Sequence, residues 1–289
     1  MSKNLSIILG IIAVIAVIAV VRWYGDAEAQ HKRGVRYYKG DGVEKNYEEA
    51  ARCFRRAAEK GHAKSQYNLG LCYDLGHGVQ KDPFEAMKWY RKAAEQGYPR
   101  AQNNVGAFYA LGKGVRQNPA EAVRWYRKAA EQGFAKAQYN LGVCYRDGAG
   151  VEKDPDEAVK WFRKAAEQGY ADAQFNFGLC YYTGNGIEAD PDEAFKWFRK
   201  AADQGHTKAQ CYLAACYLTG SGVEVNPNEA IKWFRKAAEQ GNADAQFKMG
   251  LCYETGIVVE ADSAAAIRWY KKAAAQGNKE AQEALDRLQ

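Results

Sequence analysis

Apolar and polar residues follow each other along most of the chain with the period of a helix, in pairs of segments that recur every 36 residues. Between Ala135 and Tyr170, the later segment carries its apolar side chains three and four positions apart: Ala158, Trp161, Phe162, Ala165 and Ala166. The earlier segment, from about Lys136 to Tyr145, places the following residues on one face: Ala137, Leu141, Cys144 and Tyr145. This spacing is typical of amphipathic helices with one buried stripe. Each 36-residue stretch therefore predicts two helices.

Local signals mark where the second helix begins and ends. Asp154 stands in the N-cap position, Pro155 follows at the first helical position, and Glu157 lies three residues after the cap. This is a capping box with a proline in the first turn, where its missing N–H costs no hydrogen bond. Gly169 suits a left-handed C-cap, and the glycines of residues 148–151 permit the positive φ of a tight connection. One stretch is thus predicted to be a helical hairpin.

The hairpin recurs seven times without an insertion. Its closing glycine falls at Gly61, Gly97, Gly133, Gly169, Gly205, Gly241 and Gly277. A single hairpin cannot bury its apolar stripes alone and has to stack on neighbours. We therefore expect an all-α protein, a right-handed α-solenoid of about seven hairpin repeats preceded by one apolar N-terminal helix. The expected divisions are a membrane anchor and juxtamembrane segment over 1–26, repeats over 27–62, 63–98, 99–134, 135–170, 171–206, 207–242 and 243–278, and a C-terminal capping helix over 279–289.

Two further residue types recur at a fixed position (register) of the repeat and indicate how its core is packed. Glycine recurs in the middle of the first helix, at Gly34, Gly70, Gly106, Gly142, Gly178 and Gly250. A mid-helix glycine costs about 1 kcal/mol relative to alanine, so a close contact is needed to favour it. We expect the Ala-Ala pairs of the second helix to pack there. A tryptophan recurs in the second helix, as at Trp161, and we expect it to be a buried core side chain.

The consecutive motifs resemble those of the Sel-1-like repeat: Ala-Gln-Tyr-Asn-Leu-Gly-x-Cys-Tyr, Gly-x-Gly-Val, Asp-Pro-x-Glu-Ala and Trp-Phe-Arg-Lys-Ala-Ala-Glu-Gln-Gly. The resemblance covers about residues 27–278. It implies a tetratricopeptide-like α-solenoid that acts as an adaptor or scaffold, and it does not identify the partner. The end repeats depart from the pattern, since Cys53 replaces the tryptophan in the first and Val258 replaces the second loop glycine in the last. Such departures are expected of repeats that face solvent on one side.

The N-terminal residues have a different composition. Residues Leu5 to Val21 are apolar and carry no charge, and Arg22, Trp23 and Tyr24 follow directly. A membrane-spanning helix needs about 20 apolar residues, and aromatic residues settle at the lipid interface. We predict an uncleaved single-pass anchor formed by Leu5 to Val21 with Trp23 and Tyr24. The alternative is a signal peptide with a cleavage site at residues 27–29, which would leave a soluble exported repeat protein.

Two signals conflict over which side of the membrane the repeats face. The apolar run is preceded by Lys3 and followed by a larger group of basic residues: Arg22, Lys32, Arg33, Arg36 and Lys39. Counted in this way, the positive-inside rule places the repeats in the cytoplasm. A short tail with one lysine is also how exported domains begin, and proteins resembling this one are often exported to the bacterial envelope or the endoplasmic reticulum lumen. We expect the repeats to be extracytoplasmic, periplasmic or lumenal.

The charge pattern argues against a nucleic-acid partner. The chain has 26% charged residues and a net charge of +6. Its basic residues recur as Arg-Lys pairs in the second helices, each followed by an acid three residues after the lysine, as with Lys164 and Glu167. A regular solvated helix face explains this pattern better than a stripe that binds polyanions.

Cysteine and histidine are placed as structural residues. Five of the seven cysteines share one register of the first helix: Cys72, Cys144, Cys180, Cys216 and Cys252. Equivalent helices lie about 8–10 Å apart, whereas a disulfide needs Cα atoms within about 7 Å. We expect buried free thiols, with Cys53 and Cys72 as the one pair that could meet. The four histidines have no ligand spacing, so we expect neither a metal nor a cofactor.

Catalysis is not indicated by any motif. Some cysteine-rich proteins of the resembling family bind or weakly hydrolyse β-lactams, which makes a β-lactam-recognising enzyme the alternative from another functional class. The sequence contains neither Ser-x-x-Lys nor Lys-Thr-Gly, on which that chemistry usually depends. We therefore predict a protein that is not an enzyme.

Binding is the remaining function. One position of the first helix reads Asn68, Asn104, Asn140 and Asn176, and continues as Tyr212 and Lys248. Amide side chains could hold the backbone of an extended peptide, or could form hydrogen bonds within their own hairpin. A second position varies more: Asp74, Ala110, Arg146, Tyr182, Leu218 and Glu254. We predict a membrane-tethered, non-catalytic scaffold that binds a partner protein or peptide on the concave surface lined by the first helices.

Overall fold

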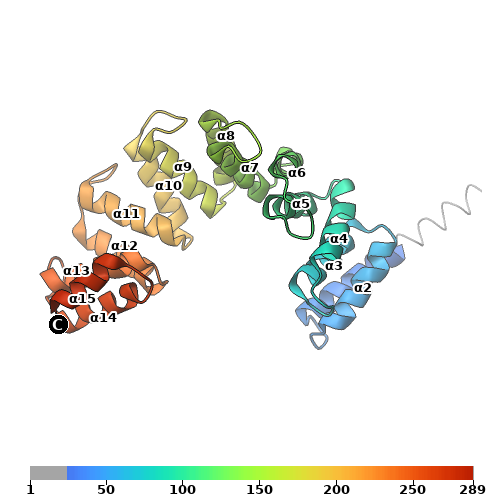
Figure 1. Ribbon diagram of the computed structural model, residues 1–289, viewed down its shortest axis with the longest axis horizontal. Coiled ribbons are helices and arrows are strands. Elements are labelled where there is room, and N and C mark those ends of the chain that lie inside the picture. The colour runs from blue at the N-terminus through green and yellow to red at the C-terminus, as the bar shows by residue number, and fades with distance from the viewer. Residues whose placement is uncertain (1–24, 289) are drawn as a thin grey trace, which may run out of the picture. The chain divides into compact units, whose positions relative to one another are not determined.

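The computed structural model describes residues 25–288, and every regular element within this range is a helix (Figure 1). Residues 25–39 form the first helix. It is followed by α2 (Tyr47–Glu59), α3 (Ala63–Leu75), α4 (Pro83–Glu95), α5 (Pro99–Leu111), α6 (Pro119–Glu131), α7 (Ala135–Asp147), α8 (Pro155–Glu167), α9 (Ala171–Thr183), α10 (Pro191–Asp203), α11 (Thr207–Thr219), α12 (Pro227–Glu239), α13 (Ala243–Thr255), α14 (Ser263–Ala274) and α15 (Lys279–Leu288). The predicted all-α class and the 36-residue hairpin period are confirmed.

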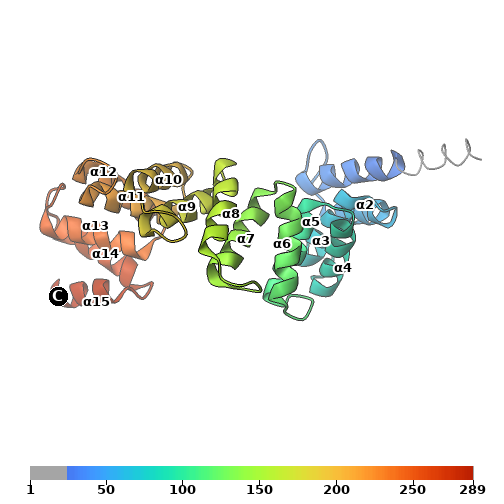
Figure 2. The same ribbon diagram turned by 90° about the horizontal axis from the view of Figure 1, so that it is seen from above.

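The chain divides into two compact parts. The N-terminal part holds the described residues up to 137 together with 149–152, and the C-terminal part holds 138–148 and 153–288. Within the C-terminal part the hairpins α9–α10, α11–α12 and α13–α14 stack in chain order, and α15 packs beside α14 (Figure 2). Leu285 of α15 is buried with Tyr270 of α14, so this short helix covers the apolar end of the last hairpin.

The second helix of each repeat begins at a strong N-cap. The Asp154 side chain accepts a hydrogen bond from the Glu157 backbone N–H at 3.0 Å. The equivalent caps of the other repeats are Asn46, Asp82, Asn118, Asp190, Asn226 and Asp262. Each satisfies a backbone N–H that has no partner inside the helix. The predicted start of the second helix at Asp154 and Pro155 therefore holds.

The glycine in the middle of the first helix packs against an aromatic ring, and not against the Ala-Ala pair that the sequence suggested. A Cβ atom added to Gly142 would lie 2.7 Å from ring carbons of Phe162, and one added to Gly70 would lie 2.6 Å from the ring of Tyr90. The ring belongs to the residue after the recurrent tryptophan, and Phe162 is fully buried. Trp161 itself is only partly buried, so the deeper aromatic register is the one beside it. The expected contact with the Ala-Ala pair is wrong because the aromatic residues Trp161 and Phe162 lie on the same apolar stripe as the alanines, and it is the Phe162 ring that meets the glycine.

The second loop glycine is held by the preceding repeat. Gly150 has a φ of +78°, and a Cβ there would lie 2.2 Å from the carbonyl oxygen of Pro119. Val258 occupies this position in the last repeat and has a φ of 67°, the one positive φ of a non-glycine residue between 25 and 288. A β-branched residue is strained in the left-handed region. The departure that the sequence showed at Val258 is therefore a site of backbone strain.

Buried glutamines join neighbouring repeats within each compact part of the chain. In the second repeat, Gln96 donates to the Gln66 side-chain oxygen at 2.6 Å, and Gln66 in turn donates to the Ala58 carbonyl of the first repeat at 3.1 Å. The same relay occurs four more times: Gln132–Gln102–Ala94, Gln204–Gln174–Ala166, Gln240–Gln210–Ala202 and Gln276–Gln246–Ala238. Gln66 is only 5% exposed, and a buried amide needs such partners. An uncharged hydrogen-bond relay is thus one recurrent component of the joint between repeats.

Within residues 25–288, none of the helices has both the length and the apolar character needed to cross a bilayer. The predicted anchor, Leu5 to Val21 with Trp23 and Tyr24, lies outside the described residues.

Candidate functional site

The C-terminal part contains an open groove with a volume of about 880 Å³. It is lined by the first helices α7, α9 and α11 and by the start of α13: Tyr139, Arg146, Asp172, Phe175, Asn176, Leu179, Gly205, His206, Thr207, Lys208, Cys211, Tyr212, Asn242 and Asp244. Ligand pockets of proteins typically span about 300–1,000 Å³ and combine apolar walls with a few polar groups. The groove has that size and that mixture.

Arg146 is held in place on one wall of the groove. Its guanidinium donates to the side-chain oxygen of Asn176 at 2.8 Å and to both carboxylate oxygens of Asp147 at 2.7 and 2.9 Å. The hydrogen bond to Asp147 raises the pKa of Arg146, and the same contact lowers the pKa of Asp147. A planar guanidinium fixed by a bidentate carboxylate is pre-organised for further hydrogen bonding.

His206 forms another wall, where one repeat meets the next. Its Nδ1 accepts a hydrogen bond from the Ala209 backbone N–H at 3.1 Å, which caps α11, and its Nε2 lies 3.3 Å from an oxygen of Asp172. Its ring stacks on Phe175 with centroids 4.8 Å apart. Burial lowers the pKa of His206, and the Asp172 carboxylate opposes that shift. The wall therefore carries a mainly neutral imidazole at neutral pH.

Two side chains of the variable register are exposed in the C-terminal part, and one of them contacts a groove residue. Tyr182 is 47% exposed and Leu218 is 46% exposed, and the Tyr182 ring meets the groove residue Tyr212 edge-on at 5.9 Å. Other members of this register are engaged within the protein: Asp74 pairs with Lys113, and Glu254 accepts from Arg287 at 2.8 Å. The register thus offers solvent-facing apolar surface in two neighbouring repeats of the C-terminal part.

The four predicted asparagines do not share one environment. Asn68 and Asn104 lie in the N-terminal part, half-buried, with Asn68 beside Phe54 in a small hollow of about 180 Å³. Asn140 and Asn176 lie in the C-terminal part, and Asn176 lines the groove. Asn176 is 7% exposed and donates to the Asp172 carbonyl at 2.8 Å, so its amide is engaged within its own helix as well as with Arg146.

Sequence reasoning did not single out Tyr139, Phe175 or His206 as groove residues. A signal existed for His206, because the residue after each closing glycine varies: His62, Tyr98, Phe134, Tyr170, His206, Asn242 and Asn278. Variation at a helix N-cap next to a neighbouring repeat indicates a position whose side chain is not fixed by the repeat itself.

The seven cysteines are free thiols in the structure. Cys53 and Cys72 are both buried and form no disulfide. Burial raises the pKa of every one of the seven thiols, that of Cys72 to about 12, which disfavours the reactive thiolate. Among residues 25–288, no three His, Cys, Asp or Glu side chains are arranged to hold a metal ion.

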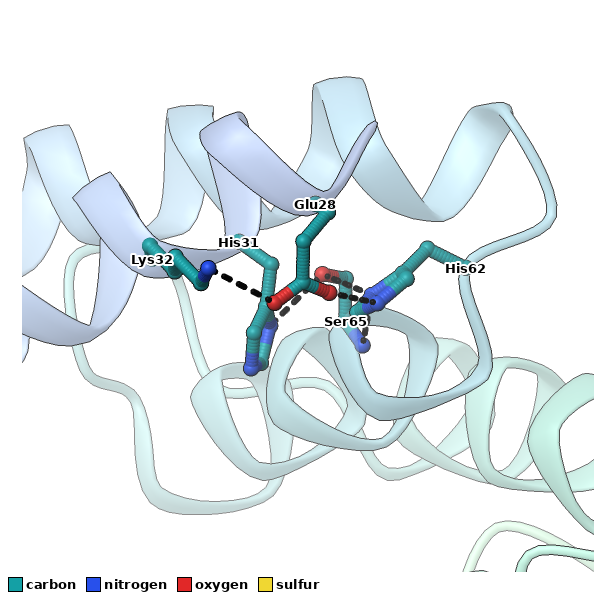
Figure 3. Close-up of polar contacts among 5 residues, drawn as sticks. All are labelled: Glu28, His31, Lys32, His62 and Ser65. Carbon is teal, nitrogen blue, oxygen red and sulfur yellow. Dashed lines mark hydrogen bonds and ion pairs between the residues drawn. The ribbon is translucent and has the colours of Figure 1, made fainter. Parts of the chain in front are cut away.

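One serine of the N-terminal part lies among the groups that activate a nucleophile. The Ser65 hydroxyl is 2.9 Å from the Nδ1 of both His31 and His62, and His62 contacts Glu28 at 3.0 Å (Figure 3). A serine hydrolase has these residue types, but its hydroxyl has to reach a substrate. Ser65 has no solvent exposure. Ser65 is therefore the buried member of a partly exposed polar network, and its hydroxyl does not reach a substrate.

Comparisons with known proteins identify the repeat. The family model described as Sel1 repeat matches residues 27–62, 63–98, 99–134, 135–170, 171–206, 207–242 and 243–278. A solved structure of a protective antigen from uropathogenic Escherichia coli, which displays an SLR fold, is 40% identical with a TM-score of 0.83, covering 91% of this chain and 56% of that chain. A Sel1 repeat protein from Oxalobacter formigenes is 38% identical with a TM-score of 0.78, covering 91% of this chain and 76% of that one. This chain thus spans little more than half of the E. coli protein. A comparison with curated proteins gave no match.

Proposed function

The chain belongs to the Sel1 repeat family, and on this basis we propose that it is a non-catalytic scaffold that binds a partner protein or peptide in the groove of its C-terminal part. Sel1 repeat proteins are generally protein-interaction scaffolds. The single observation that carries the proposal is the groove itself, with fixed polar groups on its walls and the exposed Tyr182 in contact with Tyr212. Exposed apolar side chains next to pre-organised polar groups are the usual composition of a protein-binding surface.

The predicted asparagines enter the proposal as contacts to a peptide backbone within each part separately: Asn176 at the groove, and Asn68 and Asn104 on the first helices of the N-terminal part. Asn68, Asn104 and Asn140 are half-buried, so their amides lie near the surface of the first helices. Asn176 would have to exchange its hydrogen bond from Arg146 for one from the ligand. Arg146 would then face a peptide carbonyl or carboxylate, so Asn176 and Arg146 would act together.

A peptide library displayed on phage and selected on the full chain tests the groove. We expect selected peptides to lose at least about tenfold in affinity with Arg146→Ala or Tyr212→Ala, which is about 1.4 kcal/mol. Lys196→Ala is the matched control, because Lys196 lies exposed on the second helix α10 and pairs with Glu193. Equal affinity for the wild type and both groove variants would place binding elsewhere. Failure to select any peptide with the folded chain would contradict the proposed function.

The membrane tether is the other component of the proposal. It is supported by the uncharged run from Leu5 to Val21, and we propose that the repeats are extracytoplasmic. A spanning segment should keep the full-length protein in the membrane pellet after washing with alkaline carbonate. Protease added to intact cells after permeabilisation of any outer membrane should then digest the repeats. A soluble protein with a mature N-terminus near Gln30 would contradict the tether, and protected repeats would contradict the orientation.

A further inference from the structure

Histidines take part in three of the polar side-chain contacts between the helix of residues 25–39 and the residues that follow it. Its side chains reach the following helices at these pairs: Asp26 with Lys60, Glu28 with His62, His31 with Ser65, and Tyr38 with His77. Three of the four histidines of the chain therefore lie in this one contact. The glutamine relay is also present between the first two repeats, where Gln66 reaches the Ala58 carbonyl, so the histidine contacts are an addition to it at this joint.

The hydrogen bonds around Ser65 require His62 to be neutral. The Nδ1 of His62 accepts from the Ser65 backbone N–H at 3.2 Å, which caps α3. Its Nε2 therefore carries the proton and donates to Glu28 at 3.0 Å. Figure 3 shows Glu28 and His31 projecting from the first helix towards His62 and Ser65. Protonation of His62 at Nδ1 would remove the acceptor that caps α3.

The surroundings also disfavour a charge on His31. Its ring centroid lies 4.7 Å from that of His62 and 5.9 Å from that of Phe54 on α2. The charged groups that face it are Glu28 and Lys32 on its own helix, Lys64 on α3, and His62 at the cap, while α2 contributes the Phe54 ring. Glu28 is the one acid among them, and it already pairs with His62 and with Lys32 at 3.6 Å. Burial and the neighbouring His62 together lower the pKa of His31 to about 4.

The C-terminal part contains the same arrangement without the second imidazole. Four repeats further along, His206 caps α11 and contacts Asp172, as His62 caps α3 and contacts Glu28. Phe175 stands where His31 does, and Ala209 stands where Ser65 does. The Phe175 ring stacks on His206 at 4.8 Å, so a phenylalanine fits this position without loss of the ring contact.

We propose that the cluster of Glu28, His31, His62 and Ser65 is a pH-responsive latch, which holds the first helix on α3 at neutral pH and releases it on acidification. Two imidazolium rings in contact would share a single carboxylate with Lys32, and both hydrogen bonds to Ser65 would be rearranged. Opening of the helix exposes His31 to water, where it takes up a proton at its ordinary pKa, so a fall in pH favours the open form.

Amide hydrogen exchange of the full chain at pH 7.5 and pH 5.0, corrected for the intrinsic pH dependence of exchange, tests the latch. A pKa of about 4 against the ordinary 6.5 gives an upper bound of about 30-fold on the loss of protection at pH 5.0. Because the His31 ring keeps some access to solvent, we expect the amide protection of residues 25–39 to be about tenfold lower at pH 5.0 than at pH 7.5. Protection of α9 should fall less than about threefold, since Phe175 replaces His31 there.

Two variants exchange the residues of the histidine cluster with those of the equivalent position around His206. His31→Phe should keep residues 25–39 protected at both pH values to within about threefold. The double variant Phe175→His with Ala209→Ser should give α9 the tenfold loss that the wild type shows at its first helix. If His31→Phe does not fold at pH 7.5, the double variant decides alone. Unchanged wild-type protection at pH 5.0, an equal loss in His31→Phe, or no loss in the double variant would each overturn the latch.

Discussion

The second helices of the repeats and the first helices are built under different constraints. α8 and α10 both begin with aspartate and proline and both bury a phenylalanine, Phe162 or Phe198, against a glycine of the preceding helix. The adjacent first helices α9 and α11 differ at most of their groove positions, with Asp172, Phe175 and Asn176 replaced by Lys208, Cys211 and Tyr212. The comparison indicates that the second helices supply stability, whereas the groove positions of the first helices are not fixed by the repeat.

The largest effect should come from the buried ring of a second helix. Phe162→Ala should lower the free energy of unfolding by about 3–5 kcal/mol, because the ring is fully buried against Gly142. Trp161→Ala, one residue earlier and only partly buried, should cost less. Chemical denaturation followed by circular dichroism measures both. Equal losses would mean that the two aromatic registers share the core, as the sequence alone suggested.

A smaller loss is expected from the cap of the same helix. Asp154→Ala should lower the free energy of unfolding by about 1 kcal/mol, since the Glu157 N–H loses its acceptor. Asp156→Ala is the control, because Asp156 lies in the same first turn without being the cap. If the two variants lose the same amount, the helix dipole and not the capping hydrogen bond sets the stability of this turn.

The strained loop of the last repeat should respond in the opposite direction. Val258→Gly should raise the free energy of unfolding by about 1 kcal/mol, because the left-handed region costs an L-residue roughly 1–2 kcal/mol and glycine adds flexibility to the unfolded chain. Val225→Gly, at an exposed valine of the preceding loop whose φ is not positive, should be neutral or destabilising. A thermal melt of the three proteins is sufficient. A lower melting temperature for Val258→Gly would show that the valine side chain contributes more than its backbone costs.

The smallest effect on stability is expected at the variable face of a first helix. Leu218→Ser should change the free energy of unfolding by less than about 0.5 kcal/mol, because Leu218 is 46% exposed. A loss of stability comparable with that of Phe162→Ala would remove the distinction between the two sets of helices.

The sequence was sufficient for the repeat because each local signal recurs in the same register. The N-cap Asp154, the loop glycines and the apolar stripe together determine a hairpin, and seven copies leave little freedom in how hairpins stack. The partner of Gly142 could not be read from the pattern, since Trp161, Phe162 and Ala165 all lie on one helical stripe and only packing shows which of them meets the glycine.

The groove was less accessible to sequence reasoning. The asparagine register led to Asn176, which lines the groove, but its partner Arg146 lies one repeat earlier, and a contact across 30 residues depends on how the hairpins stack. The contact between His206 and Asp172 depends in the same way on an N-cap meeting the preceding repeat. The sequence shows that the positions of Arg146 and His206 vary between repeats, but it does not show that their side chains meet at one groove.

The glutamine relay has a consequence for how such a chain can change length. A repeat inside the relay carries both an amide that reaches back to an alanine carbonyl, as Gln66 does, and an alanine that receives the next amide, as Ala94 does. The donating glutamine and the accepting alanine carbonyl are encoded in the same 36-residue module. Duplication or deletion of a whole module therefore leaves a complete relay at the new boundary. Recombination between copies can therefore lengthen or shorten the array without compensating mutations, and selection is then free to act on the side chains that each new module presents.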